Sequence, residues 1–303
     1  MRELIGSHDL LLVTLDTLRY DVAVSELEGG RTPTLAKHLP GGQWEKRHTP
    51  ASFTYAAHHA FFAGFLPTPV TPGPHERMFA ARFGGSETSG PTTYVFEAAD
   101  LPSGLAEAGY HTVCLGGVGF FNPQTPLGRV LPGLFAEAHW EREFGVTAPD
   151  GLGAQIARLE TVVAALPPER PLFTFVNVAA LHQPNKHYLR GASEDSLTSH
   201  AAALAYVDSR LQGLFDLVTS RGRPCQVIIC SDHGTLYGED GHTGHRVAHE
   251  AVWTVPYAQF VLEARATPTP RDARATPTPR DARATPTLPE AEETARRTNP
   301  GTR

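Results

Sequence analysis

The 303-residue sequence predicts an α/β fold, a three-layer α/β/α arrangement around a largely parallel central sheet. Two observations predict it. Short runs of apolar and β-branched residues alternate along the chain with segments of helical periodicity. These runs are largely apolar and do not alternate with polar residues, which is typical of strands that are buried on both faces of a parallel sheet by covering helices.

Each expected element follows from a local pattern. Segments with apolar residues at helical spacing predict helices at Gly153–Leu166 and from about Glu194 to Thr219. The apolar runs predict strands at Asp9–Leu15, Tyr110–Leu115, Pro171–Val178 and Cys225–Cys230, with a further strand at Trp253–Leu262.

A compact third helix is expected within HTPASFTYAAHHAFFAGFLP. Thr54 is the expected N-cap of this helix, and Gly64 and Pro67 are its stop signals. The positive potential at a helix N-terminus favours an alkoxide and attracts an anionic substrate. Thr54 is therefore either a plain cap or a nucleophile, and as a nucleophile it needs a metal ion to lower its pKa.

The last forty residues differ from the rest of the chain. From Ala264 the unit ARATPTPRD occurs twice and then decays into ARATPTLPE. Proline at this density excludes a helix, and the unit has no apolar face for stacking. We predict a catalytic domain over residues 1–263 and a disordered tail over residues 264–303. A partner-binding tail and a neutral expansion of a short repeat both fit this pattern.

Composition excludes several classes of function. The net charge is -6 and lysine is scarce, so the chain offers no broad basic surface for nucleic acid. The N-terminal apolar run is about six residues long, too short for a signal peptide or a membrane span. We therefore expect a cytoplasmic protein without a membrane span. Its three cysteines lie in apolar runs and are expected to be reduced core residues: Cys114, Cys225 and Cys230.

Polar side chains follow three of the predicted strands. Asp16 closes the first strand, His182 follows the third, and Asp232 and His233 follow the fourth. Ligands of parallel sheets bind beyond the carboxyl ends of the strands, so these side chains are expected at one edge. A carboxylate directly behind an apolar strand is costly to desolvate unless it is paired or bound to a cation.

Asp16 also has a plainer interpretation. It could serve as the N-cap of the segment that follows the first strand, with Thr17 or Asp21 as polar partners. The residues at the other strand ends decide between a metal ligand and a helix cap. Because three of them deliver residues of metal-ligand type, the sequence favours a metal site over a solvated loop.

Three motifs together resemble a known family. These are SDHG after an apolar strand, LVTLDTLRYD at the first strand, and a nucleophile helix that ends in a G-x-x-P step. They resemble the sulfatase-like branch of the alkaline phosphatase superfamily, and most closely an uncharacterised bacterial group of sulfatase-like hydrolases. The resemblance covers most of residues 7–262 and includes ALAYVDSRLQGLF. It implies an alkaline-phosphatase-like fold.

The resemblance also implies roles for individual residues. The family has its nucleophile ten residues before the glycine of the G-x-x-P step, which here is Thr54. Threonine-using transferases carry a second histidine twelve residues after that of SDHG, here His245, which contacts the substrate phosphate or a second zinc. His182, in an H-x-P pattern, serves the same end of the site. The implied metal ligands are Asp16, Thr54, Asp232 and His233, with His245, around one or two divalent ions, zinc or alternatively manganese.

One departure from the family bears on the substrate. Sulfatases place a cysteine within C-x-P-S-R at the nucleophile, and this chain reads TYAAH there. We therefore expect a metal-dependent hydrolase or transferase that acts on a small phosphoric mono- or diester through Thr54 and a covalent phosphothreonine. The alternatives are a sulfatase and a catalytically idle metal-binding recognition protein.

Supporting roles are expected for the remaining polar residues near these motifs. Glu239 and Asp240 are interpreted as carboxylates that orient the ligands, and His242 and His249 as surface or supporting groups. His58, His59 and His187 are open between structural roles and substrate contact. The loops 67–96 and 117–149 are expected to shape the substrate pocket.

Overall fold

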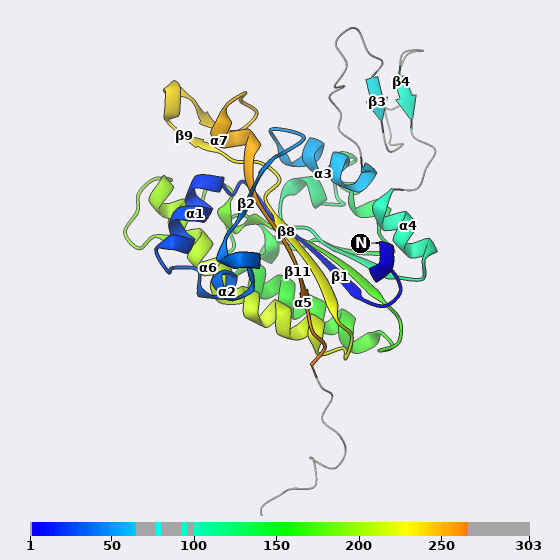
Figure 1. Cartoon of the computed structure of the whole chain (residues 1–303). Helices are drawn as coiled ribbons and strands as arrows, with labels where there is room; N and C mark the ends of the chain where they lie inside the picture. Colours follow the sequence, from blue (N-terminus) through cyan, green and yellow to red (C-terminus); the bar gives the residue numbers. More distant parts are fainter. Residues whose placement is uncertain (1, 65–76, 80–92, 96–99, 266–303) are drawn as a thin grey trace, which may run out of the picture. The chain divides into compact units, whose positions relative to one another are not determined.

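The computed structural model describes residues 2–64, 77–79, 93–95 and 100–265 (Figure 1). The chain separates into two compact units, Met1–Ala266 and Thr267–Arg303, and all described residues belong to the first. Most of the predicted pocket loop 67–96 and of the predicted tail therefore lies outside the described residues.

A seven-stranded sheet forms the centre of the first unit, in the order β2-β11-β8-β1-β7-β5-β6. Strand β1 pairs in parallel with β7 and β8, and β5 pairs in parallel with β7 and β6. Only β11 runs against its neighbours β8 and β2. The strands are β1 (Asp9–Leu15), β2 (Glu45–His48), β5 (His111–Leu115), β6 (Glu137–His139), β7 (Leu172–Val178), β8 (Cys225–Cys230) and β11 (Thr254–Leu262). The predicted largely parallel sheet is confirmed.

Helices cover both faces of this sheet (Figure 1). Along β1, Leu11, Val13 and Leu15 belong to one apolar core and Leu12 belongs to the other, because successive strand residues point to opposite faces. Helices α1, α2, α5 and α6 contribute to the first core, and α3 and α4 to the second. The helices are α1 (Tyr20–Glu28), α2 (Pro33–His38), α3 (Thr54–Ala63), α4 (Leu101–Glu107), α5 (Gly151–Ala165), α6 (Leu197–Thr219) and α7 (Glu250–Trp253).

The part of the chain that the structure describes contains no helix with both the length and the apolar character of a membrane span.

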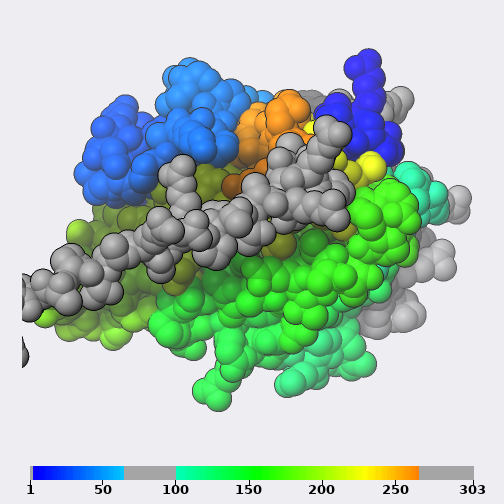
Figure 2. Space-filling view, turned by 90° about the horizontal axis from the view of Figure 1, so that it is seen from below, coloured from blue at the N-terminus to red at the C-terminus, as the bar shows by residue number. Residues whose placement is uncertain are grey.

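The N-terminal edge of the sheet is held by an ion cluster. The buried Asp9 carboxylate accepts hydrogen bonds from Arg221 Nε at 2.8 Å, Arg223 Nε at 3.1 Å and the Leu172 backbone N–H at 2.9 Å. Arg223 also donates to the Gly6 carbonyl, which ties the N-terminal segment to the loop after α6. Figure 2 views this edge, with the dark blue N-terminal segment beside yellow surface of that loop.

Candidate active site

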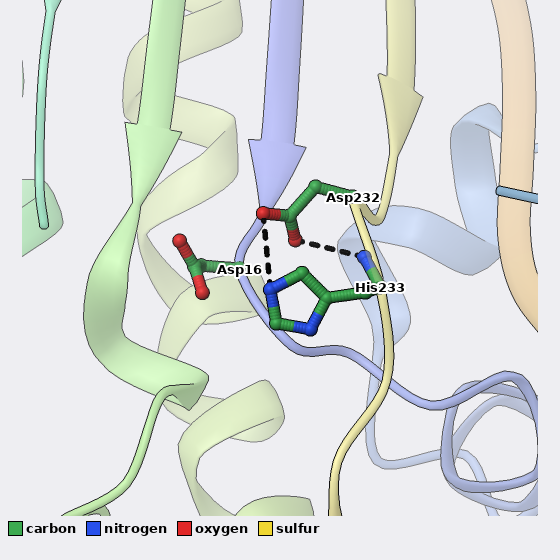
Figure 3. A group of neighbouring side chains, drawn as sticks. All are labelled: Asp16, Asp232 and His233. Atoms are coloured by element: carbon green, nitrogen blue, oxygen red, sulfur yellow. Dashed lines mark hydrogen bonds and ion pairs between the residues drawn. The ribbon is translucent and has the colours of Figure 1, made fainter. Parts of the chain in front are cut away.

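Two adjacent strands deliver an acidic and imidazole cluster to the carboxyl edge of the sheet (Figure 3). Asp16 directly follows β1, and Asp232 and His233 follow β8, its parallel neighbour. All three side chains are fully buried. One ligand atom from each lies within 4.8 Å of those of the other two, so the predicted strand-end residues do converge.

The two carboxylates of this cluster are not fully paired. Asp16 Oδ1 and Asp232 Oδ2 are buried and accept no hydrogen bond from the residues that the structure describes. Burial, reinforced by the neighbouring Asp232, raises the pKa of Asp16 to about 6, and burial raises the pKa of Asp232 to about 7. Two desolvated carboxylates with unpaired oxygens beside an imidazole are the donor set of a zinc or manganese site. The residues therefore fit a divalent cation.

His233 is held in the tautomer that a metal ligand requires. Its Nδ1–H donates to the Gly234 carbonyl at 2.9 Å, which leaves the lone pair on Nε2. Nε2 lies 3.5 Å from Asp232 Oδ2 and 3.2 Å from Thr54 Oγ1. Burial lowers the pKa of His233, which favours the neutral imidazole that binds metals.

Thr54 lies at the start of α3, with its hydroxyl facing the cluster. Thr54 Oγ1 is 3.4 Å from Asp16 Oδ2. The predicted capping role is wrong, because Phe53 occupies the N-cap and Thr54 is the first helical residue, with no side-chain cap. Its hydroxyl contacts Asp16 and His233 instead of a backbone N–H of its own helix. Gly64 ends α3 in the left-handed conformation, as predicted.

His58 supports Thr54 from inside the protein. Its Nδ1–H donates to the Thr54 carbonyl at 2.8 Å, so Nε2 accepts from Thr14 Oγ1 at 2.9 Å. Burial lowers the pKa of this histidine to about 3, and the ring packs edge-on against Phe121 and Phe175. With both nitrogens occupied and no exposed surface, His58 has a structural role and does not face the substrate pocket.

Asn177 belongs to the site although the sequence did not single it out. Its Nδ2–H₂ donates to Asp16 Oδ2 at 3.1 Å and to Thr14 Oγ1 at 3.3 Å. Its Oδ1 accepts from the backbone N–H groups of Gly117 and Val118. The amide thus fixes one Asp16 oxygen and leaves the other for a cation. The available signal was a single amide in the largely apolar strand LFTFVNV, because a buried polar group needs hydrogen-bond partners.

The turn after β1 fixes the second carboxylate. Asp232 Oδ1 accepts from the backbone N–H groups of Thr17 at 3.1 Å and His233 at 3.0 Å. Thr17 has a φ of 68°, a conformation that is strained for a β-branched residue. The alternative interpretation of Asp16 as a helix N-cap is not supported, because Arg19 is the N-cap of α1, the Thr17 backbone N–H binds Asp232 and Asp21 pairs with Arg19.

Two further histidines border the cluster. The His245 ring lies 4.7 Å from the His233 ring and 5.3 Å from the His182 ring, between centroids. Burial, and then the neighbouring His233, lowers the pKa of His245 to about 3. His182 Nδ1–H donates to the Gln183 carbonyl at 2.5 Å, which leaves its Nε2 lone pair. Both rings and Thr54 line a pocket of about 370 Å³.

This geometry agrees with the relationship of the chain to known proteins. The sulfatase family matches residues 8–259. The chain belongs to the sulfatase family. No curated protein sequence matches it.

Solved structures show the same alkaline-phosphatase-like fold. The soluble domain of lipooligosaccharide phosphoethanolamine transferase A from Neisseria meningitidis is 13% identical, with a TM-score of 0.59 over 85% of this chain and 77% of that one. The periplasmic domain of EcEptC from Escherichia coli, in a complex with Zn, is 12% identical, with a TM-score of 0.56 over 85% and 73%. An alkaline phosphatase superfamily protein from Vibrio parahaemolyticus is 17% identical, with a TM-score of 0.54 over 86% and 61%.

Glu239 and Asp240, the two carboxylates that were predicted to orient the metal ligands, contact other residues of this sulfatase-family chain. Glu239 forms an ion pair with the buried Arg19 and accepts the Tyr237 N–H at 2.6 Å. Asp240 is exposed and lies 3.3 Å from His249 Nε2. The expectation that these carboxylates orient the metal ligands is therefore wrong. The Arg19–Glu239 pair instead anchors the loop that leads to His245.

The other histidines that the sequence analysis singled out do not line the pocket. His242 is exposed, as predicted, and His249 accepts the Ala251 N–H at the start of α7. His187 is exposed and its ring packs 4.2 Å from that of Tyr188. His59 is on α3, its ring 6.0 Å from that of Tyr55. Substrate contact by His187 or His59 thus finds no support in the pocket lining.

Proposed function

We propose that this protein is a metal-dependent enzyme that transfers or hydrolyses phosphoric esters through Thr54. One observation carries the proposal. The Thr54 hydroxyl lies at the start of α3, 3.4 Å from Asp16 and 3.2 Å from His233, beside carboxylate oxygens that accept no hydrogen bond from the described residues. The similarity to a phosphoethanolamine transferase and to a zinc complex supports it.

Asp16, Asp232, His233 and the Thr54 hydroxyl would hold the metal ion, with His245 as a further ligand or phosphate contact. Oxygen and imidazole donors without a thiolate suit zinc, or alternatively manganese. When bound, the ion lowers the pKa of the coordinated hydroxyl and neutralises charge on the phosphoryl oxygens.

The residues of the chain supply the other parts of the reaction. Thr54 Oγ1 forms a bond to phosphorus while the bond to the alcohol oxygen breaks, and the proton that Thr54 loses balances the one that the leaving alkoxide gains. The N–H groups in the first turn of α3 stabilise the anionic phosphoryl group. His182 and His245 line the pocket beside it. Water or an acceptor alcohol then attacks the phosphothreonine and regenerates Thr54.

Sulfate-ester hydrolysis is the closest alternative, because the chain belongs to the sulfatase family. It is disfavoured by the threonine, because the hydrated aldehyde that sulfatases mature from cysteine cannot form on Thr54. A catalytically idle metal-binding protein is a third class of function. Such a protein has no need for a hydroxyl that faces the carboxylate cluster.

The test combines metal analysis with turnover. We expect the purified protein to contain one or two transition-metal ions and Asp232→Asn to lose metal. Thr54→Ala, which retains the two carboxylates and His233, should lose turnover of 4-nitrophenyl phosphate or bis(4-nitrophenyl) phosphate. Thr161→Ala, at an exposed threonine of α5, is the matched control and should behave as wild type. Unchanged metal content in Asp232→Asn together with unchanged turnover in Thr54→Ala would refute the proposal.

A further inference from the structure

The pocket beside Thr54 has an apolar wall. Apart from Thr54, His182 and His245, its lining comes from the segment between β5 and α5. That segment contains the short helices η4 (Gly119–Phe121) and η5 (Leu127–Arg129). We define the apolar wall as the four hydrophobic residues of this segment that line the pocket: Val118, Phe120, Leu127 and Val146.

The described lining carries no acidic residue, lysine or arginine. Its one polar side chain outside the candidate active site is Thr125. The Thr125 hydroxyl is already used within its own turn, where it accepts from the Gly128 N–H at 3.0 Å and donates to the Asn122 carbonyl at 3.4 Å. Among the described residues, the wall therefore offers no polar side chain that is ready for a charged or hydroxylated ligand.

Aromatic rings hold the centre of the apolar wall in place. The Phe120 ring lies 5.6 Å from the Tyr55 ring and 6.3 Å from the Phe53 ring, both of which flank the start of α3. Leu127, by contrast, is 44% exposed at the edge of the pocket. An exposed leucine beside a partly exposed phenylalanine forms an apolar patch next to a polar site, which is typical of a ligand-binding surface.

We propose that the substrate carries a neutral apolar group, aromatic or alkyl, on its phosphoryl ester, and that this group packs against the apolar wall. The inference rests on the proposed function, because it uses Thr54 to place the phosphoryl group. An ammonium or polyol group in the same place would lose its hydration without gaining a partner. The substrate class thus differs from the ethanolamine phosphate named for the structural neighbour.

One glycine allows the volume of the pocket to be changed without disturbing the fold. Gly119 lines the pocket, its φ is not in the left-handed region, and a Cβ added there meets no atom within 4 Å. Gly133 has the same properties in another short helix, η6 (Pro132–Leu134), outside the pocket. Gly119→Leu and Gly133→Leu are therefore a matched pair that adds the same bulk inside and outside the site.

The test uses phosphonates, which bind without being cleaved, so that leaving-group reactivity has no influence. Calorimetric titrations of the zinc-loaded full chain compare benzylphosphonate with 2-aminoethylphosphonate. We expect benzylphosphonate to bind at least about tenfold more tightly, as burial of an aromatic ring implies. Gly119→Leu should reduce this ratio to about one, Phe120→Ala should lower it several-fold, and Gly133→Leu should leave it unchanged.

Equal binding of the two phosphonates, tighter binding of 2-aminoethylphosphonate, or binding of neither would overturn the inference. So would a preference that Gly119→Leu leaves unchanged. The proposed function fails in a different way, when Asp232→Asn keeps its metal content and Thr54→Ala keeps its turnover. Since binding and turnover are measured separately, the two failures are distinguishable.

Discussion

Strand β1 begins with a buried aspartate, Asp9, and a second buried aspartate, Asp16, follows its last residue. The two carboxylates differ in the charge of the groups that surround them. Asp9 and Asp16 are both at most 1% exposed. Asp9 is neutralised by two arginines, Arg221 and Arg223, and by a backbone N–H. Among the described residues, Asp16 accepts hydrogen bonds only from the neutral Thr54 hydroxyl and Asn177 amide, and the neighbouring carboxylate of Asp232 adds to the rise of its pKa.

The difference shows what each end of the strand is for. A buried carboxylate that is paired with arginines of the same chain stabilises the fold only while both partners are present, so the role of Asp9 is structural. A buried pair of carboxylates with unpaired oxygens is costly in the absence of a cation, so Asp16 and Asp232 fit a charge supplied from outside. Removal of the Asp9 charge should therefore lower stability and leave activity unchanged, whereas removal of the Asp16 charge should lower activity and not stability.

The largest effect is expected at Asp16. Asp16→Asn should lower turnover by at least ~10³-fold, about 4 kcal/mol in activation free energy, because the site loses a charged ligand. It should not lower the free energy of unfolding of the metal-free protein, because the repulsion from Asp232 is removed. Initial rates and urea unfolding after chelation measure the two quantities. A variant that unfolds more easily but keeps its turnover would make Asp16 a structural residue.

Asp9→Asn is expected to show the reverse pattern. The amide leaves the Arg221 guanidinium buried without its counter-charge, so the free energy of unfolding should fall by about 3 kcal/mol. Turnover per folded molecule should stay the same, because Asp9 lies at the other end of β1. Denaturant unfolding and active-site-normalised rates check this. If turnover instead fell with stability unchanged, the proposed division between the two ends would be wrong.

The pH dependence of stability should also separate the two ends. The folded protein keeps a proton on Asp232 that the unfolded chain, with a pKa of 3.8, releases, because burial raises the pKa to about 7. The stability from this group is therefore present at pH 4 and is lost as the pH rises to about 7. Relative to Asp232→Asn, the metal-free wild type should lose about 3 kcal/mol across this range. The histidine contributions are common to both proteins.

Thermal unfolding of the chelated proteins at several pH values measures this difference. At pH 7 the metal-free wild type should be less stable than Asp232→Asn. Added zinc should make the wild type the more stable protein, because zinc binds the Asp232 carboxylate. A difference between the two proteins that does not vary with pH would show that Asp232 is not held in a costly ionised state.

The smallest expected effect concerns the amide that holds Asp16. Asn177→Ala removes the donor to Asp16 Oδ2 and should weaken zinc affinity about tenfold, about 1.4 kcal/mol. Gln155→Ala is the matched control, because it removes another buried amide that donates to the Leu115 and Asn177 carbonyls and not to Asp16. Equal losses of zinc affinity in the two variants would assign the effect to general destabilisation.

Much of this arrangement could be predicted from the sequence, because apolar runs set the strands. The structure has β1 and β8 at their predicted bounds, and β5, β7 and β11 begin one residue later than predicted. The short edge strands β2 and β6 were missed, because their residues are exposed or half-buried and show no apolar run. Their pairing with β11 and β5 depends on tertiary contacts.

The site residues likewise divide into those that a local sequence pattern predicts and those whose role depends on tertiary contacts. Asp16, Asp232 and His233 could be predicted because each follows a strand. The role of Asn177 could not be predicted, because the sequence of this largely apolar strand does not show which face of the sheet the Asn177 side chain lies on. Glu239 was misassigned for a related reason. It lies in a stretch crowded with ligand-type residues, but Arg19, far away in sequence, takes its carboxylate.

The carboxyl end of β1 is short of positive charge, and we propose that a metal ion supplies it. Calorimetric titration of zinc into chelator-stripped wild type, Asp16→Asn and Asp240→Asn tests it most directly, with the exposed Asp240 as the control carboxylate. We expect tight binding in wild type and Asp240→Asn, and binding at least ~100-fold weaker, about 2.7 kcal/mol, in Asp16→Asn. Equally tight binding in all three proteins would contradict the claim.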